Sequence, residues 1–153
     1  MKIMEIEALC PKPSTSTPSP AHKKYPYLLR NVEVKEVDEV WCTDITYIPM
    51  PQGHCYLVVI VDWHSRVVLS WEVSNSMDTG FCIRALQRAS ERTGRKPRVF
   101  NTDQGSQFTS PEWIQMIEGN GIKVSMDGKG HWMDNVFIER LCQSVKYEKL
   151  RLW

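Results

Sequence analysis

Three acidic residues stand at positions where carboxylates could do chemistry: Asp44, Asp103 and Glu139. Asp44 interrupts an otherwise apolar, strand-like run, where a carboxylate is costly unless it is paired, hydrogen-bonded or bound to a metal. Asp103 falls where a predicted strand ends and a turn begins, and ligands gather at such strand ends in sheets covered by helices. Glu139 lies within a long predicted helix. The spacing leaves room for a turn, helix, strand, loop and half a helix between the last two acids.

Converging carboxylates would suit divalent metal chemistry. Oxygen ligands are preferred by Mg²⁺ and Mn²⁺, and two such ions can clamp a phosphodiester. One ion activates a water or a DNA 3′-hydroxyl, and the other stabilises the leaving oxygen. Without metal, three neighbouring carboxylates repel one another, so at least one pKa should rise. The hypothesis is therefore a site for two Mg²⁺ or Mn²⁺ ions.

Structural roles for the same residues stay open at this point. Asp44 could satisfy a neighbouring turn, Asp103 could cap the helix that follows it, and Glu139 could pair with a lysine on its own helix. A trio is also easily found among 18 acidic residues. The residue types alone do not choose between these interpretations.

The first elements that must position these residues are three strands. Residues 40–49 are rich in strand formers and stop at a proline. Residues 55–62 form a continuous apolar run, which indicates a strand covered on both faces. A turn at residues 64 and 65 leads into a third strand from Arg66 to Val73. Their succession predicts an antiparallel meander.

Helices and strands alternate after the meander. Asp78 is expected to cap a helix that Gly94 ends, and Ser110 with Pro111 to open another. The remaining elements are expected to be a strand at 98–102, a helix at 111–118, a strand at 121–125 and a helix at 133–150. This order predicts an α/β, ribonuclease-H-like fold: a mixed five-stranded sheet with helices on both faces.

Two sets of large side chains also have expected positions. Arginines recur at i, i+4 steps along the helix after Asp78, which is typical of a solvated helix face. These arginines are Arg84, Arg88 and Arg92. Tryptophans are expected to pack in the core or on a sheet face. These tryptophans are Trp41, Trp63, Trp71 and Trp113.

Length and composition bound the organisation of the chain. Its 153 residues suit one domain. Residues 11–20 are almost only Pro, Ser, Thr and Lys, which indicates an extended linker. We therefore expect an N-terminal segment and linker over 1–36 and a globular domain over 37–153. A net charge of +1 gives no general attraction to phosphate, so any basic DNA contact must be local.

Cysteine usage and hydropathy bear on location. The five cysteines are odd in number, widely spaced and without a Cys-x-x-Cys pair, which favours a reduced cytosolic compartment. No run of about 18 apolar residues occurs, so no membrane-spanning helix is expected.

Three blocks of the sequence resemble one known family. Trp41–Ile48 resembles the first catalytic block of the integrase-core transposases, which belong to the retroviral-integrase (DDE) superfamily. Asn101–Ser110 resembles the second block, and Met133–Glu148 resembles the third. The likeness is to the OrfB-type transposases of bacterial insertion sequences that move through a circular intermediate. It extends from about residue 11 to residue 150.

This resemblance implies a function. It implies that Asp44, Asp103 and Glu139 bind the two Mg²⁺ or Mn²⁺ ions of a transposase that cleaves DNA and transfers its strands. The implied partners are transposon ends, target DNA and further copies of the chain, and no membrane is involved. The implied location is the bacterial cytoplasm, in association with the nucleoid.

Several further residues are candidate DNA contacts. Asn135 lies one helical turn before Glu139, and Lys146 lies two turns beyond it, so all three share a face. A solvated helix lysine is the alternative for Lys146. The full candidate set is Asn135, Lys146, Gln104, Lys129 and His131.

The sequence also departs from the family pattern. Relatives usually carry tryptophan at position 142, arginine at 143 and often arginine at 131, where this chain has Cys142, Gln143 and His131. A packing gap at Cys142 and weaker DNA contact are therefore expected. Full-length relatives also carry an N-terminal helix-turn-helix region and continue past the last helix. The hypothesis is that the chain is a truncated or decayed product.

Two other functions compete with the transposase interpretation. One is a ribonuclease-H-like nuclease or junction resolvase, which would hydrolyse its substrate without strand transfer. The other is a non-catalytic DNA-binding or oligomerising remnant of a transposase. The acidic trio favours catalysis only if its members converge in space.

Overall fold

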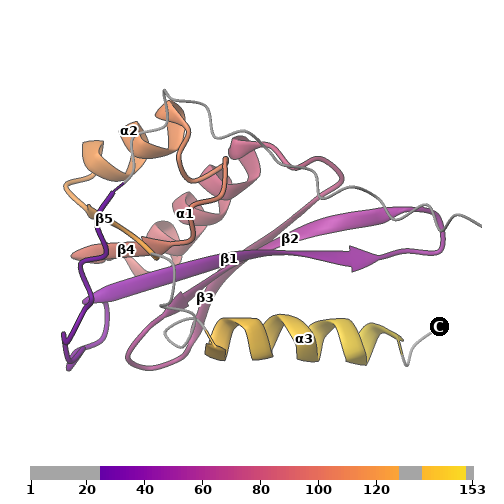
Figure 1. Ribbon diagram of the computed structural model, residues 1–153, viewed down its shortest axis with the longest axis horizontal. Helices are drawn as coiled ribbons and strands as arrows, with labels where there is room; N and C mark the ends of the chain where they lie inside the picture. Colours follow the sequence, from indigo (N-terminus) through magenta and orange to yellow (C-terminus); the bar gives the residue numbers. More distant parts are fainter. Residues whose placement is uncertain (1–24, 128–135, 151–153) are drawn as a thin grey trace, which may run out of the picture.

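A five-stranded mixed sheet with helices on both faces forms the fold (Figure 1). The computed structural model describes residues 25–127 and 136–150. Its strands are β1 (Val40–Pro49), β2 (His54–Asp62), β3 (Val68–Ser74), β4 (Val99–Thr102) and β5 (Lys123–Met126). Its helices are α1 (Thr79–Thr93), α2 (Pro111–Gly119) and α3 (Val136–Leu150). The predicted order of elements and fold class are confirmed.

The strand order is β3-β2-β1-β4-β5. β1 pairs antiparallel with β2, and β2 pairs antiparallel with β3, as expected for a meander. β4 adds to the other side of β1 in parallel, and β5 pairs in parallel with β4. β1 is therefore the central strand. Its pairing with β4 ends at Cys42, and among the described strands the rest of β1 pairs with β2 alone.

Capping residues fix the ends of the first two helices. The Asp78 carboxylate accepts a hydrogen bond from Phe81 N at 3.0 Å, and Gly94 ends α1 in a left-handed conformation at φ 65°. Ser110 Oγ accepts from Trp113 N at 3.3 Å, and Pro111 occupies the start of α2. These predicted caps are confirmed. Short polar side chains are suited to these positions because they satisfy the free N–H groups of a first helical turn.

Two predicted strand starts were wrong by two residues. The third strand begins at Val68, because Arg66 lies in a turn with φ 63° and donates its N–H to Asp62 O. The last strand begins at Lys123, because Gly121, at φ 73°, completes the turn after α2. The last helix is described from Val136, so residues 133–135 of its predicted range lie outside the described residues.

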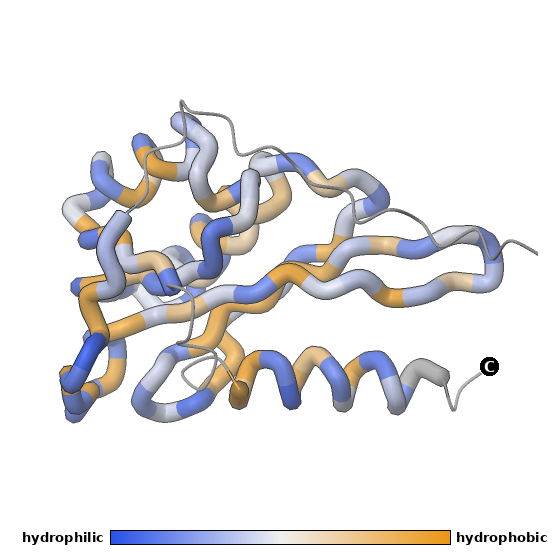
Figure 2. The backbone as a smooth tube through the Cα atoms, viewed as in Figure 1, coloured by the Kyte–Doolittle hydropathy of each residue, from blue (hydrophilic) through white to orange (hydrophobic). Residues whose placement is uncertain are grey.

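Alternating side chains divide the core into two layers. On β1, Trp41 packs with α1 and α2, whereas Cys42 and Ile48 face the other way and pack with α3. Figure 2 shows hydrophobic residues concentrated along the central strands between these helices. We call the second layer the α3-side core; its buried members are Cys42, Ile48, Leu57, Val59, Val61, Ile138 and Cys142. No helix in the described part of the chain is long and apolar enough to cross a membrane.

Part of the predicted linker contacts the sheet. Leu28 N donates to Ser125 Oγ at 3.0 Å, and Met126 N donates to Pro26 O at 3.4 Å, so residues 26–28 lie along β5. Leu29 is buried. The Pro, Ser and Thr-rich run at 11–20 lies outside the described residues. The division at residues 36 and 37 stays a prediction.

The arginines of α1 do more than face solvent. Arg84 and Arg88 are exposed, as expected, but both pair with Glu72 of β3, at 3.3 and 2.5 Å. Arg92 Nη1 donates to Leu69 O at 3.4 Å. The arginines are exposed, as predicted for a solvated helix face, and because α1 lies over β3 they also reach polar groups of that strand.

Three of the four tryptophans pack as predicted. Trp41 and Trp113 are fully buried, and Trp63 is half-buried with its ring against Phe137 of α3, at 5.5 Å between centroids. Trp71 is the exception, with 55% of its surface exposed on β3.

Candidate active site

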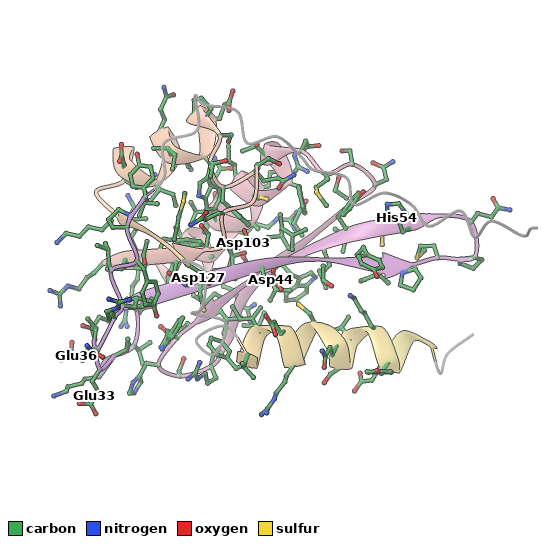
Figure 3. All side chains as sticks on the ribbon, viewed as in Figure 1. Glu33, Glu36, Asp44, His54, Asp103 and Asp127 are labelled. Carbon is green, nitrogen blue, oxygen red and sulfur yellow. The ribbon has the colours of Figure 1, made fainter. Side chains whose placement is uncertain are left out.

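The register of the sheet brings Asp44 and Asp103 to the same level. Cys42 of β1 lies opposite Asn101 of β4. Asp44 follows Cys42 by two residues, and Asp103 follows Asn101 by two residues. Because side chains alternate along a strand, Asp44 shares the face of Cys42, which is the face that α3 covers. Figure 3 shows Asp44 and Asp103 in the middle of the molecule, above the start of α3.

The Asp44 carboxyl group is electrostatically coupled to the other two acids of the trio. It is half-buried, and its pKa is raised to about 6, first by burial and then by the charge of Asp103. Glu139 raises this pKa further, whereas the hydrogen bond from Ile45 N and the charge of Lys146 lower it. Repulsion between neighbouring carboxylates raises a pKa because it disfavours the ionised form. The direction of this shift is the one expected from the sequence, with burial as its largest cause and the charge of Asp103 second.

A tight turn holds Asp103 at the end of β4. Its side chain is exposed, and Oδ1 accepts a hydrogen bond from Gly105 N at 2.9 Å. A Cβ atom at position 105 would lie 3.0 Å from that oxygen, closer than real Cβ atoms normally approach. Gly105 therefore allows the backbone to approach the carboxylate, in addition to forming the turn.

The turn is also tied to the end of β5. Gln104 Nε2 donates to Asp127 O at 3.0 Å, and Asn101 Nδ2 donates to the Asp127 carboxylate at 2.9 Å. Asn101 is fully buried, and its Oδ1 has no hydrogen-bond partner within residues 25–127 and 136–150. Gln104, a predicted DNA contact, thus contacts the protein itself, and its exposed side chain remains at the edge of the site.

Sequence reasoning missed Asp127 as a residue of this site. Thr102 pairs with Met126, so Asp103 and Asp127 each follow a paired strand end, and both are labelled in Figure 3. The strand-end rule that selected Asp103 could have selected Asp127. Glycines at 128 and 130 directly follow Asp127, so the sequence around it favours a loop over a strand end.

Helix α3 supplies the third acid. Ile138 and Cys142 are buried against the sheet, which leaves Glu139 exposed in the first turn of the helix. The Phe137 ring is held by Arg66, whose guanidinium lies 3.7 Å from the ring centroid. The position of Glu139 therefore depends on the side-chain packing of α3 rather than on backbone pairing between strands.

Lys146 lies on α3, the helix that also carries Glu139. It is half-buried, and its Nζ atom lies 4.3 Å from the centre of the Tyr47 ring. It is near enough to lower the pKa of Asp44. The other candidate DNA contacts, Asn135, Lys129 and His131, lie outside the described residues.

An apolar groove opens beside Cys142. The Cys142 thiol is buried, which raises its pKa to about 12. The groove has a volume of about 340 Å³ and includes Leu141 and Val145, which flank that cysteine on α3. Across the groove stand residues of the three antiparallel strands: Ile48, Leu57, Val59, Val68, Trp71 and Val73. The predicted packing gap at Cys142 stays a prediction.

The donor set fits a hard divalent cation in type. Carboxylate oxygens are the preferred ligands of Mg²⁺ and Mn²⁺, and Asp44, Asp103 and Glu139 supply them on one side of the sheet. Among residues 25–127 and 136–150, no three His, Cys, Asp or Glu side chains lie close enough together to hold one ion. The acids are thus coupled but do not form a closed cage.

Comparisons with known proteins define the class. The Integrase core domain family matches residues 34–131, so the chain belongs to this family. It is 34% identical over 113 residues to the transposase InsF for insertion sequence IS3A of Escherichia coli (strain K12), covering 72% of this chain and 39% of that protein. It is 33% identical over 112 residues to the transposase for insertion sequence element IS904 of Lactococcus lactis subsp. lactis (strain IL1403), covering 72% and 44%. The chain thus spans about two fifths of the length of these relatives.

Solved structures agree with this family. The HTLV-2 integrase catalytic core domain in complex with magnesium (dimeric form) is similar, with a TM-score of 0.58 and 27% identity over 69% of this chain and 65% of that one. A chain of the simian T-cell lymphotropic virus intasome shares the fold, with a TM-score of 0.64 and 21% identity over 80% and 43%. The resemblance to integrase-core transposases and the ribonuclease-H-like fold are confirmed.

Proposed function

We propose that this chain carries the catalytic core of a DDE-type transposase, which cleaves DNA and transfers strands in a metal-dependent reaction. The observation that carries the proposal is geometric: the β1–β4 register sets Asp44 and Asp103 at one level of the sheet, on the face covered by α3, which carries Glu139. Its relatives are transposases, which supports DNA as the substrate. A protein of this kind would act on DNA in the bacterial cytoplasm.

Asp44, Asp103 and Glu139 would hold the metal ions. The similar HTLV-2 core was solved with magnesium, which supports Mg²⁺ or Mn²⁺ as the cofactor. Two bound ions would neutralise phosphodiester charge and activate the attacking hydroxyl. The protein's own contribution is positioning: Gly105 N holds the Asp103 carboxylate, and α3 carries Glu139 to the same face.

DNA contact would fall to side chains around these acids. Lys146 is near Asp44 and can meet a phosphate beside it. Gln104 stands at the edge of the site, and Asn135, Lys129 and His131 are proposed contacts from sequence alone. Joining two DNA ends requires an assembly, so we also propose a homo-oligomer; the HTLV-2 core has dimeric and trimeric forms.

Plasmid nicking and strand transfer test the proposal. Supercoiled plasmid and a labelled duplex with a free 3′-hydroxyl are incubated with the chain and Mn²⁺ or Mg²⁺. Asp103→Asn should reduce nicking and joining to background, and Mn²⁺ binding measured by calorimetry should weaken in parallel. Glu112→Gln, an exposed carboxylate on α2, is the matched control and should leave both unchanged.

A non-catalytic module is the second candidate. It is favoured by the lack of a closed metal cage among the described residues. DNA binding unaffected by Asp44→Asn, with no nicking in either metal, would support it and contradict the transposase proposal. Metal-dependent hydrolysis of an RNA–DNA hybrid without strand transfer would instead indicate a nuclease.

A further inference from the structure

An aromatic group lies near the end of the β1–β2 hairpin and has no place in the catalytic site. Tyr47 and Tyr56 are direct cross-strand partners, and His54 precedes Tyr56 by two residues. Because side chains alternate along a strand, all three lie on one face of the hairpin. We call Tyr47, His54 and Tyr56 the hairpin aromatic group.

These rings contact one another by their edges. The Tyr47 and His54 rings are 6.5 Å apart with planes at 78°, and those of His54 and Tyr56 are 5.1 Å apart at 90°. His54 Nε2 and Tyr56 Oη are 2.9 Å apart, so a hydrogen bond fixes this pair. Tyr47 keeps 61% of its surface exposed. An aromatic ring held in place but largely open to solvent can still contact a planar partner.

A cation links this group to the catalytic acids. Lys146 Nζ lies 4.3 Å from the centre of the Tyr47 ring, within the range of a cation–π contact. The same ammonium is near enough to Asp44 to lower its pKa. Exposed aromatic rings next to a positive charge are the combination by which proteins hold unpaired nucleic acid strands.

Tyr47 and Asp44 are three residues apart on β1, about 10 Å along the strand, so their side chains lie on opposite faces. Tyr47 shares the face of Trp41 and Ile45, whereas Asp44 shares the face that α3 covers. Lys146 nevertheless reaches the Tyr47 ring from α3, and β4 pairs with β1 no further than Cys42, so a bound strand would pass around this open edge of β1. Figure 1 shows α3 running beside the hairpin, and Figure 3 shows His54 further along the hairpin than Asp44.

We propose that Tyr47, supported by His54 and Tyr56, contacts unpaired bases of a DNA strand whose reacting phosphate lies at Asp44 and Asp103. This inference rests on the proposed function, since it assumes DNA at the acidic site. A purely structural cross-strand pair would explain the Tyr47–Tyr56 register. Such a structural role would not require the Tyr47 ring to be exposed to solvent. Nor would it require Lys146 to lie beside both that ring and Asp44.

A base-stacking probe tests this inference. The probe is a duplex with a three-nucleotide overhang carrying one 2-aminopurine, compared with the same duplex made blunt, with Ca²⁺ replacing Mg²⁺ to slow cleavage. The wild-type protein should quench the fluorescence of the overhang base. Tyr47→Ala should abolish the quenching and weaken overhang binding at least about fivefold, whereas Tyr47→Phe should retain both.

Matched variants keep the result interpretable. Tyr147→Ala removes another exposed tyrosine, on α3 beside Lys146, and should bind as the wild type does. Tyr47→Leu keeps an apolar strand residue without the ring, so it separates lost stacking from a damaged hairpin; thermal unfolding of each variant checks the fold. Blunt-duplex affinity should be unchanged in the Tyr47 variants.

Three results would overturn the inference: quenching that survives Tyr47→Ala, equal weakening of blunt and overhang duplexes, or no binding of either by the wild type. Plasmid nicking by the same preparations distinguishes it from the proposed function. Nicking with quenching independent of Tyr47 refutes the stacking site alone. Quenching that depends on Tyr47 without nicking refutes the enzyme proposal alone.

Discussion

Replacing Asp44 by asparagine should stabilise the folded chain at neutral pH while it removes a proposed metal ligand. Asparagine has nearly the shape of the protonated acid, carries no charge and can still accept the hydrogen bond from Ile45 N. The pKa of Asp44 rises from 3.8 to about 6, mainly through burial and the charge of Asp103. Each unit of such a shift corresponds to about 1.4 kcal/mol. The upper limit of stabilisation is therefore about 3 kcal/mol at pH 7.5.

The pH dependence gives the direction of the effect. An acid whose pKa is higher in the folded state binds its proton more tightly there. Its contribution to stability is therefore greatest below about pH 4 and is lost as the pH rises through about 6. The advantage of Asp44→Asn over the wild type should consequently fall from about 3 kcal/mol at pH 7.5 to about 1 kcal/mol at pH 4.5.

Urea unfolding followed by tryptophan fluorescence measures this difference, because Trp41 and Trp113 are buried in the core. Wild type and Asp44→Asn are compared at both pH values without divalent metal. Glu36→Gln, at an exposed position before β1, is the control and should change stability by less than about 0.5 kcal/mol. An Asp44→Asn variant that is no more stable than the wild type at pH 7.5, or equally stabilised at both pH values, would refute the electrostatic account.

Three further predictions concern the scaffold. Asp78→Ala and Ser110→Ala should each lower the free energy of unfolding in urea by about 1 kcal/mol, because each removes a helix cap; no change would mean that the cap is not formed. Ile138→Ala should cost about 2–5 kcal/mol, since the side chain is fully buried under α3; a cost below 1 kcal/mol would place α3 off the sheet. Alkylation at pH 8 followed by mass spectrometry should modify half-buried Cys55 before Cys82, whose burial raises its pKa to about 12; the reverse order would contradict the packing.

Much of the fold was predictable because its signals are local. The caps at Asp78 and Ser110 and the stop at Gly94 depend on residues within one helical turn. The strand at 40–49 was predicted with its observed bounds, since proline ends the run of strand formers. The wrong strand starts have one cause: Arg66 and Gly121 adopt positive φ angles in turns. A non-glycine residue in that conformation gives no sequence signal, because the turn around it selects the conformation.

The site was predictable in part. Asp44 was selected because a carboxylate in an apolar strand needs compensation, and its raised pKa reflects the same cost. The link from Asp127 to Asn101 and Gln104 was not predicted, because it depends on the pairing register of β4 and β5. The sequence does not specify that register locally.

The three acids of the site are held by two different parts of the fold, the sheet and helix α3. Two of these acids, Asp44 and Asp103, are placed by the β1–β4 pairing and by the turn at Gly105, which are backbone constraints. Glu139 depends instead on how α3 packs, through Ile138, on the α3-side core. Repulsion between the carboxylates opposes the approach of Glu139, and a divalent cation would reverse the sign of that interaction. If these acids hold a divalent cation as proposed, metal binding would therefore draw α3 toward a fixed sheet, and the packing beneath the helix would affect metal affinity together with the ligands.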